Sequence, residues 1–293
     1  MSIGSNISAP DISVIVVTYF TGPSLWKCLR SCADAKEVII VNNGNHPHVV
    51  ERLISYAEKH DHIHLLDGNG NIGFAAACNL GAKQAQSEIL MFLNPDAVLH
   101  EPALEEMFNA LTSLPKPSVV GGRLLDIYGK EQRGARRGNL TPWSALVSMT
   151  GLAKFSQKSS IFTNMHWENR PLPKQPQEVP ALSGACMMFR KPDFEQIGGF
   201  DEKYFLHVED LDICRNIYNA GGKVVFVPTA EITHYGSTSK VHILRVNWYK
   251  TKGLVRYFLK FSKTPWSKAG AALLAPAIFL AIMVRASWLS LKS

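Results

Sequence analysis

The string Asn94-Pro95-Asp96 ends an apolar run, EILMFLNPD (88–96), and places a carboxylate just after an expected buried strand. Carboxylate oxygens are ligands that Mg²⁺ and Mn²⁺ prefer, and such a cation neutralises the concentrated charge of a bound diphosphate. Asp96 is therefore a candidate metal ligand, with phosphate oxygens and water completing the shell. The alternative is that Asp96 only opens a turn or caps the next helix.

A second cluster, His207-Val208-Glu209-Asp210-Leu211-Asp212, holds four ionisable side chains in six residues at an expected helix start. Carboxylates stabilise a helix N-terminus, which is one explanation for the cluster. The other is that one carboxylate faces a cleft and acts as a general base toward an alcohol. On this string alone both interpretations stay open.

Two further strings give weaker evidence of a functional site. His234, in Thr233-His234-Tyr235-Gly236, is a structural histidine unless it converges on Asp96, where an imidazole can join a Mn²⁺ shell. Asn71-Ile72-Gly73-Phe74 leads a loop into a helix, and a helix N-terminus favours anions. GNGNIG has the G-x-G-x-x-G spacing but follows the third expected strand, so it does not support a dinucleotide-binding interpretation.

The elements that must position these residues are strands and helices in alternation. Apolar runs at 13–19, 37–43, 62–68 and 88–96 alternate with helical patterns at 24–35, 48–59 and 75–86. Continuous apolar strands joined by helices predict a parallel sheet, with ligands at the carboxyl ends of its strands. The polar residues at those ends are Thr18, Tyr19, Asn42, Asn43, Asp67 to Gly70, Asn94 and Asp96.

The rest of the chain is less regular. We expect a helix at 103–114 and a strand at 118–126, then a long, partly mobile connection over 128–180 with some helix around 142–154. Order returns at SGACMMFRK (183–191), and a short helix follows Pro192. Glu209 to Asn219 reads as a helix closed by glycines, and 223–236 as a strand, a turn and a short strand.

Composition and charge restrict the class of protein. The 293 residues include five cysteines and no C-x-x-C, which excludes a disulfide scaffold and a paired-thiol zinc site and indicates a reducing compartment. The N-terminus lacks the pattern of a secretory signal. From Lys240 onward there are ten basic residues and no acidic one, which indicates an anionic partner surface.

The apolar stretch near the C-terminus favours a membrane surface over nucleic acid. Residues 269–284 are sixteen uncharged residues interrupted by Pro276, fewer than the ~18–20 needed to span a bilayer as a helix. We expect an interfacial amphipathic anchor. The alternative is a helix packed on the core or in a dimer interface.

In their order and spacing, seven strings resemble glycosyltransferase family 2, most closely its rhamnosyltransferase-like branch. They are VIVVTYF, VIIVNNG, NIGFAAACN, LNPDA, LSGACMMFRK, IGGFDEKYFLHVEDLDICR and THYGSTS, and the resemblance covers about residues 11–255. It implies an α/β GT-A fold, a Rossmann-like, mostly parallel sheet flanked by helices. The expected catalytic domain covers 1–240, with a nucleotide-binding half at about 11–126 and an acceptor half at about 180–240, and a basic, amphipathic membrane-associating extension covers 241–293.

The resemblance also implies residue roles. Asp210 matches the catalytic base with Glu209 as runner-up, and Asp96 and His234 match metal positions. Asn42 stands where the family usually has the aspartate that contacts the nucleobase. The implied nucleotide-binding residues are Thr18, Tyr19, Asn42, Asn71, Gly73, Asn79, Asn94 and Asp96, and the implied acceptor or sugar residues are Gly184, Ala185 and His207.

What the resemblance implies for activity is an inverting, metal-dependent hexosyltransferase using Mg²⁺ or Mn²⁺. The expected reaction moves L-rhamnose from dTDP-L-rhamnose to a lipid-linked glycan in bacterial surface polysaccharide (O-antigen) synthesis, on the inner, cytoplasmic face of the membrane. UDP-hexose or UDP-N-acetylhexosamine donors are alternatives, and a homodimer is a further expected partner. A non-catalytic nucleotide-sugar-binding subunit is the alternative of another class, because asparagine stands at positions 42 and 94.

Overall fold

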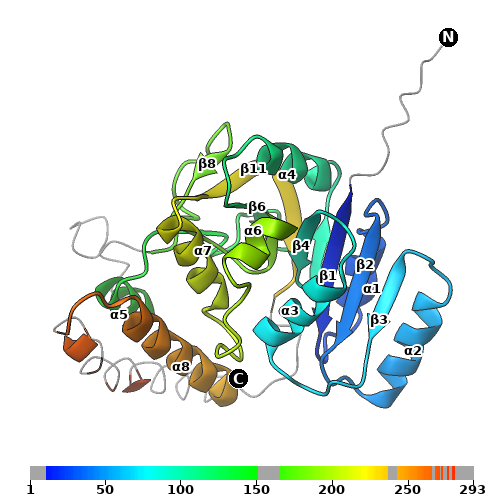
Figure 1. Cartoon of the computed structure of the whole chain (residues 1–293), viewed down its shortest axis with the longest axis horizontal. Helices are drawn as coiled ribbons and strands as arrows, with labels where there is room; N and C mark the ends of the chain where they lie inside the picture. Colours follow the sequence, from blue (N-terminus) through cyan, green and yellow to red (C-terminus); the bar gives the residue numbers. More distant parts are fainter. Residues whose placement is uncertain are drawn as a thin grey trace, which may run out of the picture.

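The computed structural model describes residues 11–150, 165–236 and 243–265, with residues 268–270, 272, 276, 279 and 280. Within these residues, helices cover both faces of one large sheet (Figure 1). Most of the stretch expected as an anchor, 269–284, lies outside the described residues.

Nine strands of the described residues form the large sheet, in the order β3-β2-β1-β4-β10-β6-β11-β5, with β8 paired to β11. The first four strands along the chain run parallel, as do β6 and β11, whereas β10 lies antiparallel between β4 and β6. The bounds are β1 Ile12–Thr18, β2 Glu37–Asn42, β3 Ile63–Leu66, β4 Ile89–Leu93, β5 Ala97–Leu99, β6 Ser118–Leu125, β8 Gln177–Glu178, β10 Cys186–Arg190 and β11 Lys223–His234. β7 (Arg136–Arg137) and β9 (Ala181–Leu182) pair separately.

The helices form two layers, one on each face. Val14 and Val16 of β1 belong to one buried cluster, with α1, α2 and α4, and Ile15 and Val17 belong to the other, with α3, α6, α7 and α8. Successive side chains of a strand face opposite sides, so a strand covered on both faces is apolar throughout. The bounds are α1 Ser24–Arg30, α2 Pro47–Ala57, α3 Phe74–Gln84, α4 Ala103–Thr112, α5 Pro142–Thr150, α6 Lys191–Gln196, α7 Glu209–Asn219 and α8 Ile243–Phe261.

The expected parallel order of the first four runs is confirmed, and so is the helix at 209–219. The expectation of two strands in 223–236 is wrong, because β11 is one strand with a register shift between Val227 and Glu231. Pro228 lies in that irregularity, where a residue without an N–H interrupts no ladder bond. The short strand β5 was not expected. The predicted helix around 142–154 begins as α5, and its last residues lie outside the described part.

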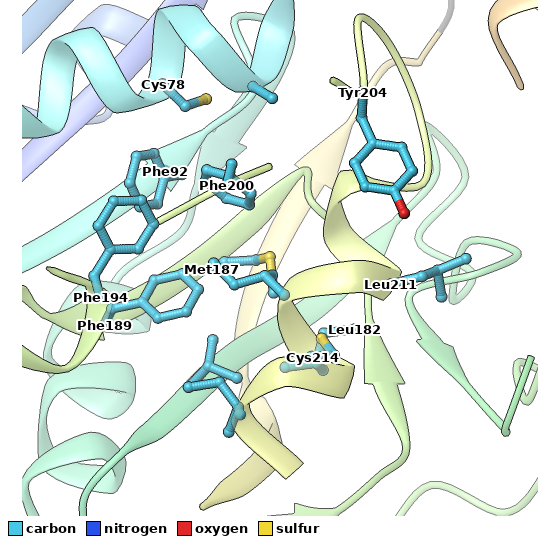
Figure 2. Packing of buried hydrophobic residues seen from close by; sticks show 14 of the residues in the cluster. Cys78, Phe92, Leu182, Met187, Phe189, Phe194, Phe200, Tyr204, Leu211 and Cys214 are labelled. Carbon is cyan, nitrogen blue, oxygen red and sulfur yellow. The ribbon is translucent and has the colours of Figure 1, made fainter. Parts of the chain in front are cut away.

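Four phenylalanines tie the sheet to the segment before α7. Phe92 of β4 lies 4.9 Å from Phe194 and 5.0 Å from Phe200 between ring centroids, and Phe194 lies 5.4 Å from Phe200. Figure 2 shows these rings with Phe189 packed together beside Met187. Such aromatic pairs contribute about 0.5–1.5 kcal/mol each beyond their area burial. The cluster therefore fixes the chain that leads into α7 against the centre of the sheet.

The last long helix, α8, packs on this same core. Its Leu254, Tyr257 and Phe258 are buried in the cluster that contains Phe92. On the basic face of α8, Arg256 and Lys260 bind the Asp201 carboxylate at 2.6 and 3.1 Å. These two residues of the basic C-terminal region therefore neutralise a carboxylate that precedes α7. Among the described residues, no helix has the length and apolar character needed to span a membrane.

Candidate active site

Asp96, His234 and Asn94 converge where β4 and β11 end. The pairing of β5 with β11 sets Ala97 opposite His234, which brings the neighbouring Asp96 beside the histidine. Asp96 Oδ1 lies 3.2 Å from His234 Nε2, and Asn94 Nδ2 lies 3.3 Å from the same nitrogen. The convergence on which the metal interpretation of His234 depends is therefore present.

Gln132 fixes the orientation of His234. Gln132 Oε1 lies 2.5 Å from His234 Nδ1, and Gln132 Nε2 donates to the His234 carbonyl at 3.3 Å. The amide oxygen can only accept, so this contact assigns an imidazole proton to Nδ1 and turns Nε2 toward Asp96. A hydrogen-bonded imidazole of this kind is the usual arrangement of a metal-ligating histidine.

The Asp96–His234 pair fits a divalent cation that is shared with a ligand. No cluster of three His, Cys, Asp or Glu side chains suited to a metal exists in the part of the chain that is described. The protein thus offers one carboxylate and one imidazole, and phosphate oxygens and water must supply the remaining positions.

Asp210 lies in the first turn of α7 and accepts three hydrogen bonds. Arg137 Nη2 and the Gly184 N–H donate to Oδ2 at 2.8 and 3.1 Å, and the Leu211 N–H donates to Oδ1 at 2.8 Å. Gly184 permits this approach, since a Cβ there would lie 3.2 Å from the Asp210 Cβ. Burial alone would raise the pKa of Asp210, but the Arg137 charge and the backbone donors outweigh it and lower that pKa. Asp210 is therefore an ionised carboxylate at neutral pH.

Its neighbour Glu209 is in the opposite state. Burial and the adjacent Asp210 charge raise the pKa of Glu209 to about 8. Its Oε2 is buried and has no hydrogen-bond partner among the described residues. Glu209 therefore holds a proton at neutral pH. Neighbouring carboxylates with such different pKa values are typical of functional sites.

The chain enters α7 through a strained turn. His207 and Val208 have φ of 67° and 76°, in the left-handed region that non-glycine residues rarely adopt. Each such residue costs on the order of 1–3 kcal/mol and persists only where its surroundings fix it. Gly253 of α8 packs on this turn, and a Cβ there would lie 3.1 Å from the His207 carbonyl oxygen. Helix α8 thus supports the turn that presents Asp210, while the His207 side chain is exposed.

The loop before β10 joins the two halves of the site. The Asn94 N–H donates to the Ala185 carbonyl at 2.9 Å, and the neighbouring Gly184 N–H donates to Asp210. Asn94 and residues 184–185 therefore connect the Asp96–His234 pair to the Asp210–Arg137 pair.

The asparagines expected to contact a nucleotide mostly bond to the protein itself. Asn42 Oδ1 accepts from the Asn45 N–H and Nδ2 at 3.0 and 2.8 Å. Asn71 Oδ1 accepts from the Gly73 N–H at 3.1 Å. Asn79 Nδ2 donates to the Phe200 carbonyl at 2.8 Å, and the Phe200 N–H returns to its Oδ1 at 3.0 Å. Asn79 thus connects α3 to the segment before α7.

Three other residues expected to bind the nucleotide lie at the end of β1 and just before α3. The Thr18 side chain is buried, with its hydroxyl 3.1 Å from that of Thr21. Tyr19 packs edge-on against Phe20. Gly73 has a φ of 89°, and a Cβ there would lie 2.9 Å from the Phe205 carbonyl oxygen, which accepts the Phe74 N–H. The Phe205 carbonyl therefore accepts one of the backbone N–H groups in the first turn of α3. Fewer of these N–H groups are left to bind an anion.

Sequence reasoning missed Gln132 and Arg137, which hold His234 and Asp210. Both lie in the segment 128–180, which has no hydrophobic periodicity, so nothing in the sequence pattern indicated that they lie at the site. The described part of that segment is anchored, because the buried Arg136 binds Glu131 at 2.7 and 3.1 Å.

Comparisons with known proteins match most of the chain to one family. The model of Glycosyl transferase family 2 matches residues 13–198, and that of the N-terminal domain of galactosyltransferase matches residues 168–241. Rhamnosyltransferase WbbL of Escherichia coli (strain K12) is 38% identical over 76% of this chain and 83% of its own length. The N-acetylglucosaminyl-diphospho-decaprenol L-rhamnosyltransferase of Mycobacterium tuberculosis is 26% identical over 78% of this chain and 77% of its own length.

A solved structure supports the fold. The crystal structure of GalNAc-T7 with UDP, GalNAc and Mn²⁺ superposes with a TM-score of 0.59 at 16% identity, over 76% of this chain and 43% of that chain. This chain thus spans less than half the length of that structure. The match confirms the expected GT-A fold.

Proposed function

We propose a donor, an acceptor and a catalytic base for this chain, which belongs to glycosyl transferase family 2 and is a hexosyltransferase. The proposed donor is dTDP-L-rhamnose, and the proposed reaction places L-rhamnose on a hydroxyl of a bacterial surface glycan. Two relatives whose names are those of rhamnosyltransferases support rhamnose as the transferred sugar. UDP-hexoses and UDP-N-acetylhexosamines are the alternative donors.

The proposed acceptor is carried on a lipid at the inner face of the cytoplasmic membrane. The name of the Mycobacterium tuberculosis relative, which contains a diphospho-decaprenol, supports a lipid-linked acceptor. An open groove of about 870 Å³ beside α8 adds support, because its lining includes the apolar side chains of Trp248, Val255, Leu259 and Phe279 together with Lys252. Basic residues beside an apolar surface suit anionic lipid, at about 1 kcal/mol each.

In the proposed reaction, Asp210 accepts the proton of the acceptor hydroxyl. The hydroxyl oxygen forms a bond to the anomeric carbon as the bond from that carbon to the diphosphate oxygen breaks on the opposite side. The configuration at the anomeric carbon is therefore inverted, and the leaving group is a nucleoside diphosphate. In this proposal Gly184 and Ala185 form the floor of the site between the acceptor and the donor. Arg137 keeps Asp210 ionised and oriented.

Asp96 and His234 would hold a divalent cation, Mg²⁺ or Mn²⁺, which when bound neutralises charge on the leaving diphosphate. The imidazole nitrogen favours Mn²⁺, because Mg²⁺ prefers oxygen ligands. The rest of the contribution belongs to the protein: Gln132 orients His234, and Asn94 Nδ2 lies 3.3 Å from His234 Nε2.

Asp210 is preferred to Glu209 as the base for a physical reason. A general base must be ionised and within reach of the hydroxyl before it can take a proton. At neutral pH Asp210 is ionised beside Arg137, whereas Glu209, with a pKa raised to about 8, carries its own proton.

The observation that carries this proposal is the joining of the Asp96–His234 pair and the Asp210–Arg137 pair through residues 184–185. The test incubates the purified chain and Mn²⁺ with a synthetic N-acetylglucosaminyl diphospholipid and one donor at a time. We expect a product heavier by one deoxyhexose with dTDP-L-rhamnose. Transfer from a UDP-sugar alone would replace the proposed donor, and transfer from no donor would reject the proposal.

A further inference from the structure

The rim formed by the carboxyl ends of β1, β2 and β3 is rich in asparagine, and its amides are already engaged. Asn45 Nδ2 donates to the Thr18 carbonyl at 2.9 Å, and its Oδ1 accepts the Phe20 N–H at 2.7 Å. Asn43 Oδ1 accepts the Ile72 N–H at 3.0 Å. These amides shape the loops, which reduces their capacity to recognise a ligand.

Asn42, at the end of β2, is engaged on both sides. Its Oδ1 accepts two hydrogen bonds from Asn45, which matches the two lone pairs of an amide oxygen. Its Nδ2 donates to Asp67 Oδ1 at 2.6 Å, and the residue is 5% exposed. A ligand N–H that reached Asn42 would find its acceptor already used.

Asp67 is the neighbouring side chain with acceptor capacity left. It follows β3 directly and is exposed. Within the described residues its carboxylate accepts one side-chain hydrogen bond, the one from Asn42. An ionised carboxylate has about four acceptor positions, so it can take a further N–H from a ligand while Asn42 holds it in place.

The distance along the sheet edge suits a nucleobase at this position. In the order β3-β2-β1-β4, the end of β3 lies three strand spacings from the end of β4, or about 14 Å at ~4.8 Å per spacing. The diphosphate site proposed above lies at β4. An extended nucleoside diphosphate with its phosphates there directs its base toward β2 and β3.

We propose that Asp67, positioned by Asn42, accepts the ring N3–H of the donor's pyrimidine and so selects uracil or thymine over cytosine. This rests on the proposed function, which supplies the nucleotide. Uracil and thymine present an N–H at position 3, whereas cytosine presents a lone pair there that a carboxylate repels. In this assignment Asn42 acts through Asp67 rather than touching the base.

The test compares UDP, dTDP and CDP, with GDP and ADP as purine probes, by calorimetry in Mn²⁺ on the full chain. The decisive variant is Asp67→Asn, which can still accept from Asn42 through Oδ1 but turns an N–H donor toward the base. Asp61→Asn is the matched control, because Asp61 is exposed and precedes the same strand at the other end of the sheet.

We expect the wild-type chain to bind UDP and dTDP at least tenfold more tightly than CDP or the purine nucleotides. In Asp67→Asn the UDP and dTDP affinities should fall about tenfold or more, as expected for loss of a hydrogen bond to a charged group. The affinity for CDP should stay the same or rise, so the preference for UDP and dTDP over CDP should become smaller or reverse. Asp61→Asn should match the wild type.

The failures are distinguishable. If the wild type binds no nucleotide, the proposed function fails and this inference with it. If the wild type prefers UDP or dTDP and Asp67→Asn keeps the same preference, the inference alone is wrong. A wild-type chain that does not prefer UDP and dTDP over CDP and the purine nucleotides would also overturn it.

Discussion

At the scale of single residues, the site separates two carboxylates that stand next to each other in the sequence. Asp210 accepts from Arg137, Gly184 and Leu211 and is ionised, whereas Glu209 is buried with one oxygen unpaired within the described residues. The helix N-terminus stabilises negative charge there by about 0.3–1 kcal/mol, which supports one ionised carboxylate more readily than two. The electrostatic asymmetry gives each acid a different protonation state.

Arg137 should set the acid limit of activity. Its charge lowers the pKa of Asp210, and the base must be ionised, so removing the charge lets that pKa rise. In Arg137→Gln the acid limb of the kcat–pH profile should therefore move to higher pH. Arg137→Lys keeps the charge and should lie nearer the wild type. A glutamine variant with an unmoved acid limb would mean that Arg137 has no electrostatic effect on the base.

Asp96 should couple nucleotide binding to the metal. It supplies the carboxylate of the two-residue set, so Asp96→Ala should weaken binding of the preferred nucleotide in Mn²⁺ by about tenfold or more. The wild type should show the same loss when EDTA replaces Mn²⁺, and EDTA should change the variant little. Calorimetry with and without metal measures this. Equal affinity in all four measurements would remove Asp96 from the metal site.

At the scale of elements, α8 is held to the domain by charge as well as by apolar contact. Asp201 accepts from Arg256 at 2.6 Å and Lys260 at 3.1 Å, and Lys260 also binds the buried Asp212 at 2.7 Å. Burial opposes ionisation of Asp201, but its hydrogen bonds to Arg256 and Lys260 prevail and lower its pKa. Because α8 packs on the turn at His207, its attachment also supports the site.

Asp201→Asn should lower the free energy of unfolding at pH 7 by about 1–2 kcal/mol, since two cations lose a charged partner. A lowered folded-state pKa adds stability above the unfolded pKa near 3.8, and this is lost as pH falls through the folded value. The difference from wild type should therefore shrink in strong acid. Denaturant unfolding measures it, with the exposed Asp34→Asn as control. An Asp201 variant no less stable than that control would show that the charges do not hold α8.

The elements that the sequence predicts are those with a local signal. Continuous apolar runs predict β1 to β4, and the acid-opened, glycine-closed pattern predicts α7. The antiparallel insertion of β10 between β4 and β6 carries no such signal, because strand partners far apart in the chain are chosen by tertiary packing. The same holds for the site: Asp96, His234 and Asp210 stand in recognisable strings, whereas Gln132 and Arg137 reach them only through the folded chain.

At the scale of the whole molecule, the basic C-terminal region takes part in the packing of the domain. Part of its charge, on Arg256 and Lys260, is used inside the domain. The remainder lies along the same region as an apolar groove that Trp248 and Leu259, among others, line. We propose that this remainder binds the membrane that carries the acceptor.

A chain that ends at residue 262 keeps α8 and its core contacts, so it should fold. It loses the apolar stretch 269–284 and four of the ten basic residues that follow position 239. We expect its binding to phosphatidylglycerol-containing liposomes to fall several-fold, and transfer to a short soluble acceptor to persist. Liposome pelleting at matched ionic strength measures the difference. Equal pelleting of the two chains would show that the extension does not anchor the enzyme.

The most direct test of the account is the pair Asp210→Asn and Glu209→Gln, each compared with wild type in turnover and in donor affinity. We predict that Asp210→Asn loses transfer by about 10²–10⁴-fold with donor affinity nearly unchanged, because only proton acceptance is removed. Glu209→Gln replaces a protonated acid with a neutral amide of similar shape and should keep most of its turnover at pH 7. Substantial turnover in Asp210→Asn, or loss of transfer in Glu209→Gln alone, would contradict the assignment of Asp210 as the base.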